Sequence, residues 1–136
     1  MLTRKEAREN AFILIFEKSF NDNSLEEILE TAKSVRDFST DEYVERVIFG
    51  VFENLENIDA LISENAKGWK IERISRVVLS LIRLAIFEML HIPEIPVSVS
   101  VNEAVVLCKK YATEDDASFL NGILGTVSRK HMKEEE

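Results

Sequence analysis

The chain has 136 residues, a size that fits one domain and buries about two thirds of the unfolded chain's surface. It is 46% hydrophobic, but only four residues are glycine and two are proline, which disfavours turn-rich β-proteins and favours helices. The single cysteine, Cys108, excludes an internal disulfide, and no apolar run reaches the ~20 residues of a membrane span, so we expect a cytoplasmic protein.

The net charge of −8 is unevenly distributed along the chain. Residues 21–66 carry 12 acidic and three basic side chains, whereas residues 67–91 carry five basic and two acidic ones. Residues 1–20 are slightly basic, with four basic and three acidic side chains. This pattern disfavours a general polyanion-binding protein and is compatible with a small basic patch on an acidic body.

Hydroxyl residues followed three positions later by glutamate predict four helix starts, because the two side chains of such a capping box satisfy each other's backbone donors. The pairs are Thr3–Glu6, Ser24–Glu27, Ser39–Glu42 and Ser100–Glu103. Apolar residues at helical spacing follow the first two pairs. From Asp41 the same spacing continues for about seven turns to Ile62, which predicts one long third helix that ends before Gly68.

Residues 75–90 are apolar on nearly all sides, which is typical of a central, buried helix. The two prolines of "HIPEIP" predict a loop after it, because the residue before a proline disfavours helix. A helix over about residues 99–111 and a polar joint, "ATEDDA", come next. The adjacent acids Asp115 and Asp116 fit the start of a further helix, where carboxylates are favourable.

The segment Ala117 to Val127, "ASFLNGILGTV", holds an Asn-Gly pair of the kind that also forms hairpin turns. Its apolar residues do not alternate but share one arc of a helical wheel, so we predict a helix. A glycine inside a helix costs up to ~1 kcal/mol relative to alanine. Either close packing against another helix or a flat surface for a ligand or partner would offset that cost. The arc opposite the apolar one carries small and polar residues, which include Ser118, Asn121, Gly122 and Gly125.

Catalytic and metal-binding patterns are not evident in the sequence. Glu88 and His91 have the Glu-x-x-His spacing of di-iron bundles, but the chain has no second copy of that unit. We therefore predict no metal site, and we place His91 at a helix end. Cys108 has no histidine near it in sequence and is predicted to be a small core residue. The sequence does not indicate an enzyme.

Five segments of the chain, taken in order, carry a resemblance to a known family. They are "LTRKEARENAFILIF", "IDALI" with a tryptophan shortly after it, "LIRLAIFEML", "IPVSVSVNEAVVLCKKY" and "SFLNGIL". Together they resemble the NusB family of transcription antitermination factors, from about Thr3 to Val127.

The resemblance implies a single all-α domain of about seven helices, in two three-helix subdomains over about residues 1–67 and 68–132, with a short extra helix near Trp69. It implies binding of the single-stranded boxA element of ribosomal RNA transcripts together with the small-subunit ribosomal protein called NusE. That complex joins other Nus factors on RNA polymerase and prevents premature termination, without a cofactor or catalysis. A protein-only helical adaptor and the helical module of an rRNA methyltransferase are the alternatives.

The resemblance also implies a set of RNA-facing residues, because cations hold phosphates and flat side chains stack on unpaired bases. By position in the family they are Arg4, Lys5, Arg8, Phe16, Arg76, Arg83, Tyr111, Asp115 and Phe119. Core packing is the alternative role for Phe16 and Phe119, and a buried ion pair is the alternative for Arg83. We further expect Arg8 and Arg83 to share one basic patch.

Overall fold

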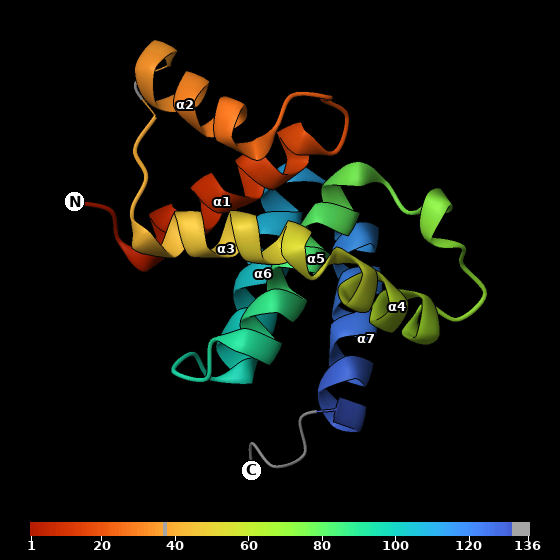
Figure 1. The fold of residues 1–136 in the computed structure, drawn as a ribbon. Helices are drawn as coiled ribbons and strands as arrows, with labels where there is room; N and C mark the ends of the chain where they lie inside the picture. The colour runs from red at the N-terminus through yellow and green to blue at the C-terminus, as the bar shows by residue number, and fades with distance from the viewer. Residues whose placement is uncertain (37, 132–136) are drawn as a thin grey trace.

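A computed structural model describes residues 1–36 and 38–131 of the chain. Within these residues it contains seven α-helices, one 3-10 turn (η1) and no strand, which confirms the all-helical prediction and the short extra helix near Trp69 (Figure 1). The elements are α1 (Arg4–Lys18), α2 (Leu25–Val35), α3 (Glu42–Glu53), α4 (Leu55–Asn65), η1 (Ile71–Arg73), α5 (Arg76–His91), α6 (Val97–Tyr111) and α7 (Glu114–His131).

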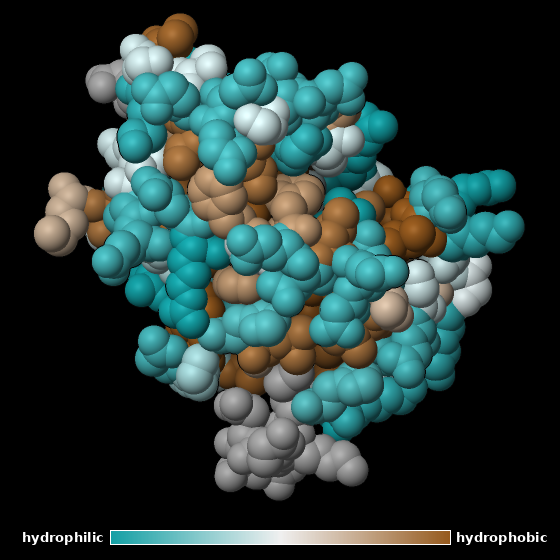
Figure 2. Space-filling view, viewed as in Figure 1, coloured by the Kyte–Doolittle hydropathy of each residue, from teal (hydrophilic) through white to brown (hydrophobic). Residues whose placement is uncertain are grey.

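Helix α5 is the centre of the molecule, as its apolar sequence predicts. It packs against α1, α3, α4, α6 and α7, so nearly every side of it meets another helix. The apolar faces of the other helices join it in one continuous core. The face drawn in Figure 2 is hydrophilic over most of its area, and hydrophobic residues show between the hydrophilic ones, mainly near its centre and at its right side. A division into two subdomains near residue 67 stays a prediction, and its expected end at residue 132 lies outside the described residues.

The predicted capping boxes are confirmed at the first two helices. Thr3 caps α1 and Ser24 caps α2, each reciprocally with the glutamate three residues later. The box predicted at Ser39 is wrong, because Asp41 is the residue that accepts the hydrogen bond from the Val44 N–H at the start of α3. A carboxylate two residues closer to the helix fills that role.

The box predicted at Ser100 is also wrong, because α6 begins at Val97, directly after Pro96. Proline fits a helix start, since its fixed φ suits the first turn and its missing N–H has no partner there. Ser100 therefore lies inside the helix. Its hydroxyl donates to Glu88 Oε1 on α5 at 2.7 Å.

The long third helix predicted from Asp41 to Ile62 is two helices, α3 and α4, which change direction at Asn54 (Figure 1). The backbone N–H and the side-chain Nδ2 of Asn54 both bind the carbonyl of Gly50, at 3.0 and 2.8 Å. Asparagine competes with the helix for backbone partners in this way, and it ends α3 there. The apolar spacing continues across the break because Ile58 and Ile62 are also buried.

The segment "SFLNGIL" is helical, as predicted, within the uninterrupted helix α7. Close packing at Gly122 is not the reason for the glycine, because a Cβ there would have no neighbouring atom within 4 Å. Ser118, Asn121 and Gly122 are exposed. At Gly125 a Cβ would be in van der Waals contact with the end of the flexible Arg129 side chain, at 3.4 Å from Nη1. The helix-packing interpretation of this face is therefore wrong at Gly122.

We expect Gly122→Ala to raise stability by up to about 1 kcal/mol, because alanine favours helix and nothing obstructs its methyl group. Gly50→Ala is the matched control inside another helix. Its Cβ would lie 2.3 Å from two ring atoms of the buried Phe87, so overpacking should cost about 1–3 kcal/mol. Thermal unfolding followed by circular dichroism measures both; a loss of stability in Gly122→Ala would contradict the open surface.

Candidate nucleic-acid interface

Four aromatic side chains line up where the end of α1 meets the end of α6. We call Phe12, Phe16, Phe20 and Tyr111 the aromatic row. Ring centroids are 5.0 Å apart between Tyr111 and Phe12, 6.1 Å between Phe12 and Phe16, and 4.9 Å between Phe16 and Phe20. Phe12 is buried and Phe16 is half-buried, whereas Phe20 is 53% exposed and Tyr111 is 40% exposed. The row thus rests on the core and presents rings at the surface.

Charged groups flank the aromatic row at both ends. The Arg76 guanidinium lies over the Phe20 ring, with Cζ 5.3 Å from the centroid. At the other end, Lys110 and Tyr111 both donate to the Glu9 carboxylate. These bonds, first that of Lys110 and then that of Tyr111, hold the pKa of Glu9 below its usual value. Burial, followed by the bond to Glu9, raises the pKa of Tyr111 to about 12, so the hydroxyl stays protonated.

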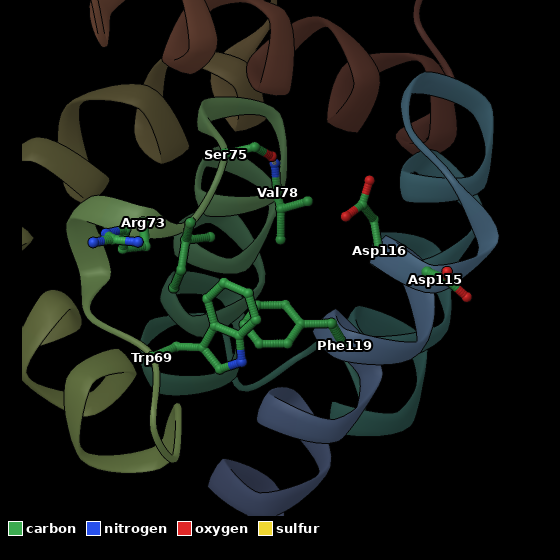
Figure 3. A pocket seen from close by; sticks show the side chains of 8 residues that line it. Trp69, Arg73, Ser75, Val78, Asp115, Asp116 and Phe119 are labelled. Atoms are coloured by element: carbon green, nitrogen blue, oxygen red, sulfur yellow. Dashed lines mark hydrogen bonds between the residues drawn. The ribbon is translucent and has the colours of Figure 1, made fainter.

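A pocket of about 340 Å³ adjoins this region, lined by residues from the segment that precedes α5, the first turn of α5 and the start of α7 (Figure 3). We call it the Trp69 pocket; its lining residues are Trp69, Arg73, Ile74, Ser75, Val78, Asp115, Asp116 and Phe119. The Trp69 and Phe119 rings meet edge to face at 5.4 Å between centroids. Arg73 lies on one side of this ring pair and the two aspartates lie on the other.

The Trp69 pocket has the chemistry of a site for a flat, hydrogen-bonding group. Trp69 is 53% exposed, so an aromatic face is open to solvent, and the Asp115 and Asp116 carboxylates can accept hydrogen bonds. Asp116 also caps α7 with Thr113, as predicted for a helix start. Ser75 lines the pocket and the next residue, Arg76, lies over Phe20, so the aromatic row and the pocket meet at the start of α5.

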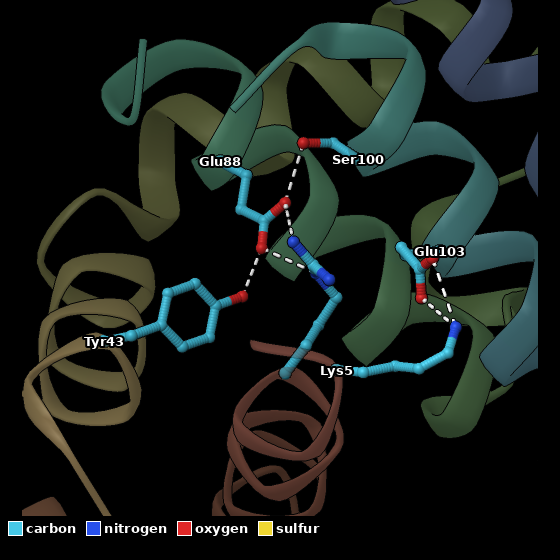
Figure 4. A network of polar contacts seen from close by, with 6 residues as sticks. Lys5, Tyr43, Glu88, Ser100 and Glu103 are labelled. Carbon is cyan, nitrogen blue, oxygen red and sulfur yellow. Dashed lines mark hydrogen bonds and ion pairs between the residues drawn. The ribbon is translucent and has the colours of Figure 1, made fainter. Parts of the chain in front are cut away.

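Arg8 does not lie at this interface. It is 3% exposed, and its guanidinium binds Glu88, with Nε 2.8 Å from Oε2 and Nη2 3.3 Å from Oε1. Glu88 is fully buried and also accepts hydrogen bonds from Tyr43 and Ser100, so one carboxylate joins α1, α3, α5 and α6 (Figure 4). The prediction that Arg8 faces RNA is corrected, because its side chain is 3% exposed and its Nε and Nη2 are bound to Glu88.

Glu88 stabilises the positive charge of the buried Arg8 side chain. Burial on its own lowers the pKa of Arg8, but the hydrogen bond and negative charge of Glu88 outweigh it, so the pKa is raised above the usual value. Burial, and then the charge of Glu88, raise the pKa of Tyr43 far above the usual range. Arg8 is thus cationic and Tyr43 neutral at every physiological pH, so the hydrogen bonds of both to Glu88 do not depend on pH through these two groups.

Arg83 lies apart from Arg8, so the single basic patch predicted for them is wrong. Its Nε and Nη2 bind both carboxylate oxygens of Asp59 at 2.9 and 2.8 Å, which links α5 to α4. Position 83 is about 140° around α5 from position 88, so the two ion pairs lie on different sides of that helix. Arg83 therefore has the role given above as its alternative to RNA binding, that of a partner in an ion pair within the protein.

The remaining predicted cations lie at the start of α1. Lys5 pairs with Glu103 at 2.9 Å, whereas Arg4 is exposed and lies over the Tyr43 ring, with Cζ 4.4 Å from the centroid. Arg4 and Phe16 are 12 residues apart on one helix, a separation of about 18 Å along its axis. The structure thus gathers Phe16, Arg76, Tyr111, Asp115 and Phe119 at one end of α1 and leaves Arg4 and Lys5 at the other.

Four residues that the sequence did not assign to RNA binding complete the aromatic row, the Trp69 pocket and the buried network around Arg8. The spacing of Phe20 could have indicated its place, because it follows Phe16 by four residues, as on one face of a helix. Helix α1 itself ends before Phe20. In the sequence, Trp69 is only a marker of the family resemblance. Tyr43 and Glu88 carry no such signal, because their partners are 45 and 80 residues away in sequence.

Cys108 is fully buried, as predicted, and burial followed by the charge of Asp116 raises the pKa of its thiol to about 11. Across the described residues, no three side chains of the metal-ligating types lie together. None of the helices in residues 1–36 and 38–131 combines the length and the apolar character needed to cross a membrane.

Comparisons with known proteins agree with this geometry. The NusB family model matches residues 5–129. The transcription antitermination protein NusB of Clostridium acetobutylicum is 42% identical over 128 residues, which is 93% of this chain and 95% of the relative. The solved structure of Thermotoga maritima (T. maritima) NusB superimposes with a TM-score of 0.88 at 36% identity, over 98% of this chain and 96% of that one.

A second solved structure, of the antitermination factors NusB and NusE in complex with double-stranded RNA, has the same fold. Its TM-score is 0.84 at 23% identity, over 94% of this chain and 97% of that one. The family model covers most of the chain, and the relative in Clostridium acetobutylicum has nearly the same length. This protein belongs to the NusB family.

Proposed function

We propose that this protein is a transcription antitermination factor that binds the boxA element of ribosomal RNA transcripts jointly with the ribosomal protein NusE. The observation that carries the proposal is the exposed aromatic row beside Arg76, which adjoins the Trp69 pocket. Single-stranded RNA is held by rings under its unstacked bases and by cations on its phosphates. The relatives named as antitermination proteins, and the NusB–NusE–RNA complex with the same fold, support it.

Within this proposal, the site residues have separate tasks. Phe16, Phe20 and Tyr111 offer stacking surfaces, Arg76 contacts a phosphate, and Phe119 with Asp115 belongs to the Trp69 pocket, where a base can stack and donate to a carboxylate. Arg4 and Lys5 contact the RNA further along its backbone. The activity is binding and assembly without catalysis, and it takes place in the cytoplasm, where transcripts are made.

The charge of the chain explains why a second protein takes part. Residues 21–66 carry a net charge of −9, and two of the predicted RNA-facing arginines, Arg8 and Arg83, are paired with acids. A basic ribosomal protein is attracted to such an acidic body and brings positive potential to the shared RNA site. We expect the protein to bind boxA weakly alone and more tightly in the heterodimer.

Isothermal calorimetry around the binding cycle tests the proposed function. We expect NusE to tighten boxA binding by about 5–150-fold, the range of typical coupling energies, and RNA to tighten NusE binding by the same factor. A scrambled RNA of equal length is the control. If boxA binds no better than the scrambled RNA, or if NusE leaves its affinity unchanged, the protein-only adaptor becomes the better explanation.

A further inference from the structure

The three cations at the start of α1 differ in what already binds them. Lys5 is held by Glu103 and Arg8 by Glu88. Arg4 forms no ion pair or side-chain hydrogen bond with any other described residue, although it is exposed. Among the described residues, Arg4 is thus the member of this basic group with no N–H donor bound to an acidic side chain.

Arg4 is nevertheless not a loose side chain. Its guanidinium lies over the Tyr43 ring at 4.4 Å, and Tyr43 itself is 7% exposed and donates its hydroxyl hydrogen bond to the buried Glu88. A guanidinium held over a ring by a cation–π contact does not use its N–H donors in hydrogen bonds to that ring's neighbours. The ring therefore orients the cation without using the groups that bind phosphate.

The surroundings provide space for such a ligand. Arg4 and Tyr43 line a hollow of about 380 Å³ together with Arg46, whose Nη2 donates to the His91 carbonyl at 2.7 Å. Asp41, Glu42 and Glu94 also line the hollow, so it is not expected to bind anions in general. Because the acidic residues of the hollow offset its basic ones, net charge alone does not attract a phosphate. Binding there depends on a guanidinium that is already oriented toward the ligand.

We propose that Tyr43 is a positioning residue for an RNA contact made by Arg4, its ring being fixed in the core through Glu88. The inference rests on the proposed RNA-binding function. Arg4 loses less side-chain freedom on binding a phosphate because the ring already restricts it. Tyr43 touches no RNA in this role, and its effect passes entirely through Arg4.

A double-mutant cycle on RNA affinity tests the proposal. Arg4→Ala should weaken boxA binding by the heterodimer about 5-fold at 0.1 M salt and reduce the salt slope by about 0.7, the contribution of one phosphate. In a Tyr43→Leu background the same change should cost less than about 2-fold. In Tyr43→Phe, which keeps the ring but loses its bond to Glu88, the cost should lie between that of Tyr43→Leu and the full amount. Lys130→Ala, an exposed cation at the far end of α7, should have equal effects in all backgrounds.

An RNA-free measurement keeps the proposal separate from the proposed function. The Arg4 side-chain N–H resonance in the NMR spectrum should show a ring-current shift in the unmodified protein, identified by its loss in Arg4→Lys. A normal chemical shift in the unmodified protein overturns the proposal even if Tyr43→Leu does not fold. An equal cost of Arg4→Ala in all Tyr43 backgrounds, or no cost in the unmodified protein, overturns it while RNA binding stands. Absence of boxA binding instead refutes the proposed function.

Discussion

Replacing Glu88 by leucine is expected to lower the free energy of unfolding by about 3–5 kcal/mol. The carboxylate is fully buried and is the only acid that pairs with Arg8 among the described residues. Its removal leaves a guanidinium in the core without a counter-charge, and the Tyr43 and Ser100 hydroxyls lose their acceptor as well. Urea unfolding monitored by circular dichroism measures the loss.

Two controls separate the buried charge from the loss of a contact. The double variant Arg8→Met, Glu88→Leu removes both charges and should lose much less than the single variant, since apolar replacement of a buried pair is often close to neutral. Lys5→Met breaks the pair with Glu103 at the surface, where the lysine side chain is 67% exposed, and should cost no more than about 1 kcal/mol. A Glu88→Leu variant as stable as Lys5→Met would contradict the buried network.

Much of the fold follows from local sequence patterns. Apolar residues at helical spacing and the capping boxes at Thr3 and Ser24 placed the first helices, and the all-round apolar run placed α5 at the centre. The break at Asn54 could not be read in this way. Ile58 and Ile62 continue the apolar spacing, and the break depends on which acceptor the Asn54 side chain takes. A periodic pattern records which residues are buried but not the direction of the helix that carries them.

The candidate site also has a part that could be predicted from the sequence and a part that depends on tertiary contacts. Phe16 and Tyr111 could be proposed from the resemblance, and the structure places them in one row. Whether each predicted cation is free or paired with an acid, in contrast, depends on its tertiary partners. Arg8 and Glu88 are 80 residues apart, and in sequence Glu88 looked only like half of a metal motif. Whether an arginine is free or paired is decided by such distant acids, so composition and position alone could not distinguish Arg4 from Arg8.

Truncation of Phe20 is expected to weaken boxA binding by about 1–3 kcal/mol, the contribution of one stacked base. The ring is 53% exposed and lies beyond the end of α1, so Phe20→Ala should leave the free energy of unfolding nearly unchanged. Because stacking releases no counterions, the dependence of affinity on salt should also stay the same. Fluorescence anisotropy with labelled boxA over a range of salt concentrations measures affinity and slope together.

Arg76→Ala distinguishes charge from stacking at the same point on the surface. Its guanidinium lies over the Phe20 ring, so both variants alter one patch, but only the loss of the cation should flatten the salt dependence, by about 0.7 for one phosphate. Val35→Ala, which removes an exposed apolar side chain from α2, is the control and should change neither quantity. If Phe20→Ala binds boxA like the unmodified protein while Arg76→Ala does not, the RNA backbone passes the start of α5 without a base on the aromatic row. The stacking role would then be confined to the Trp69 pocket.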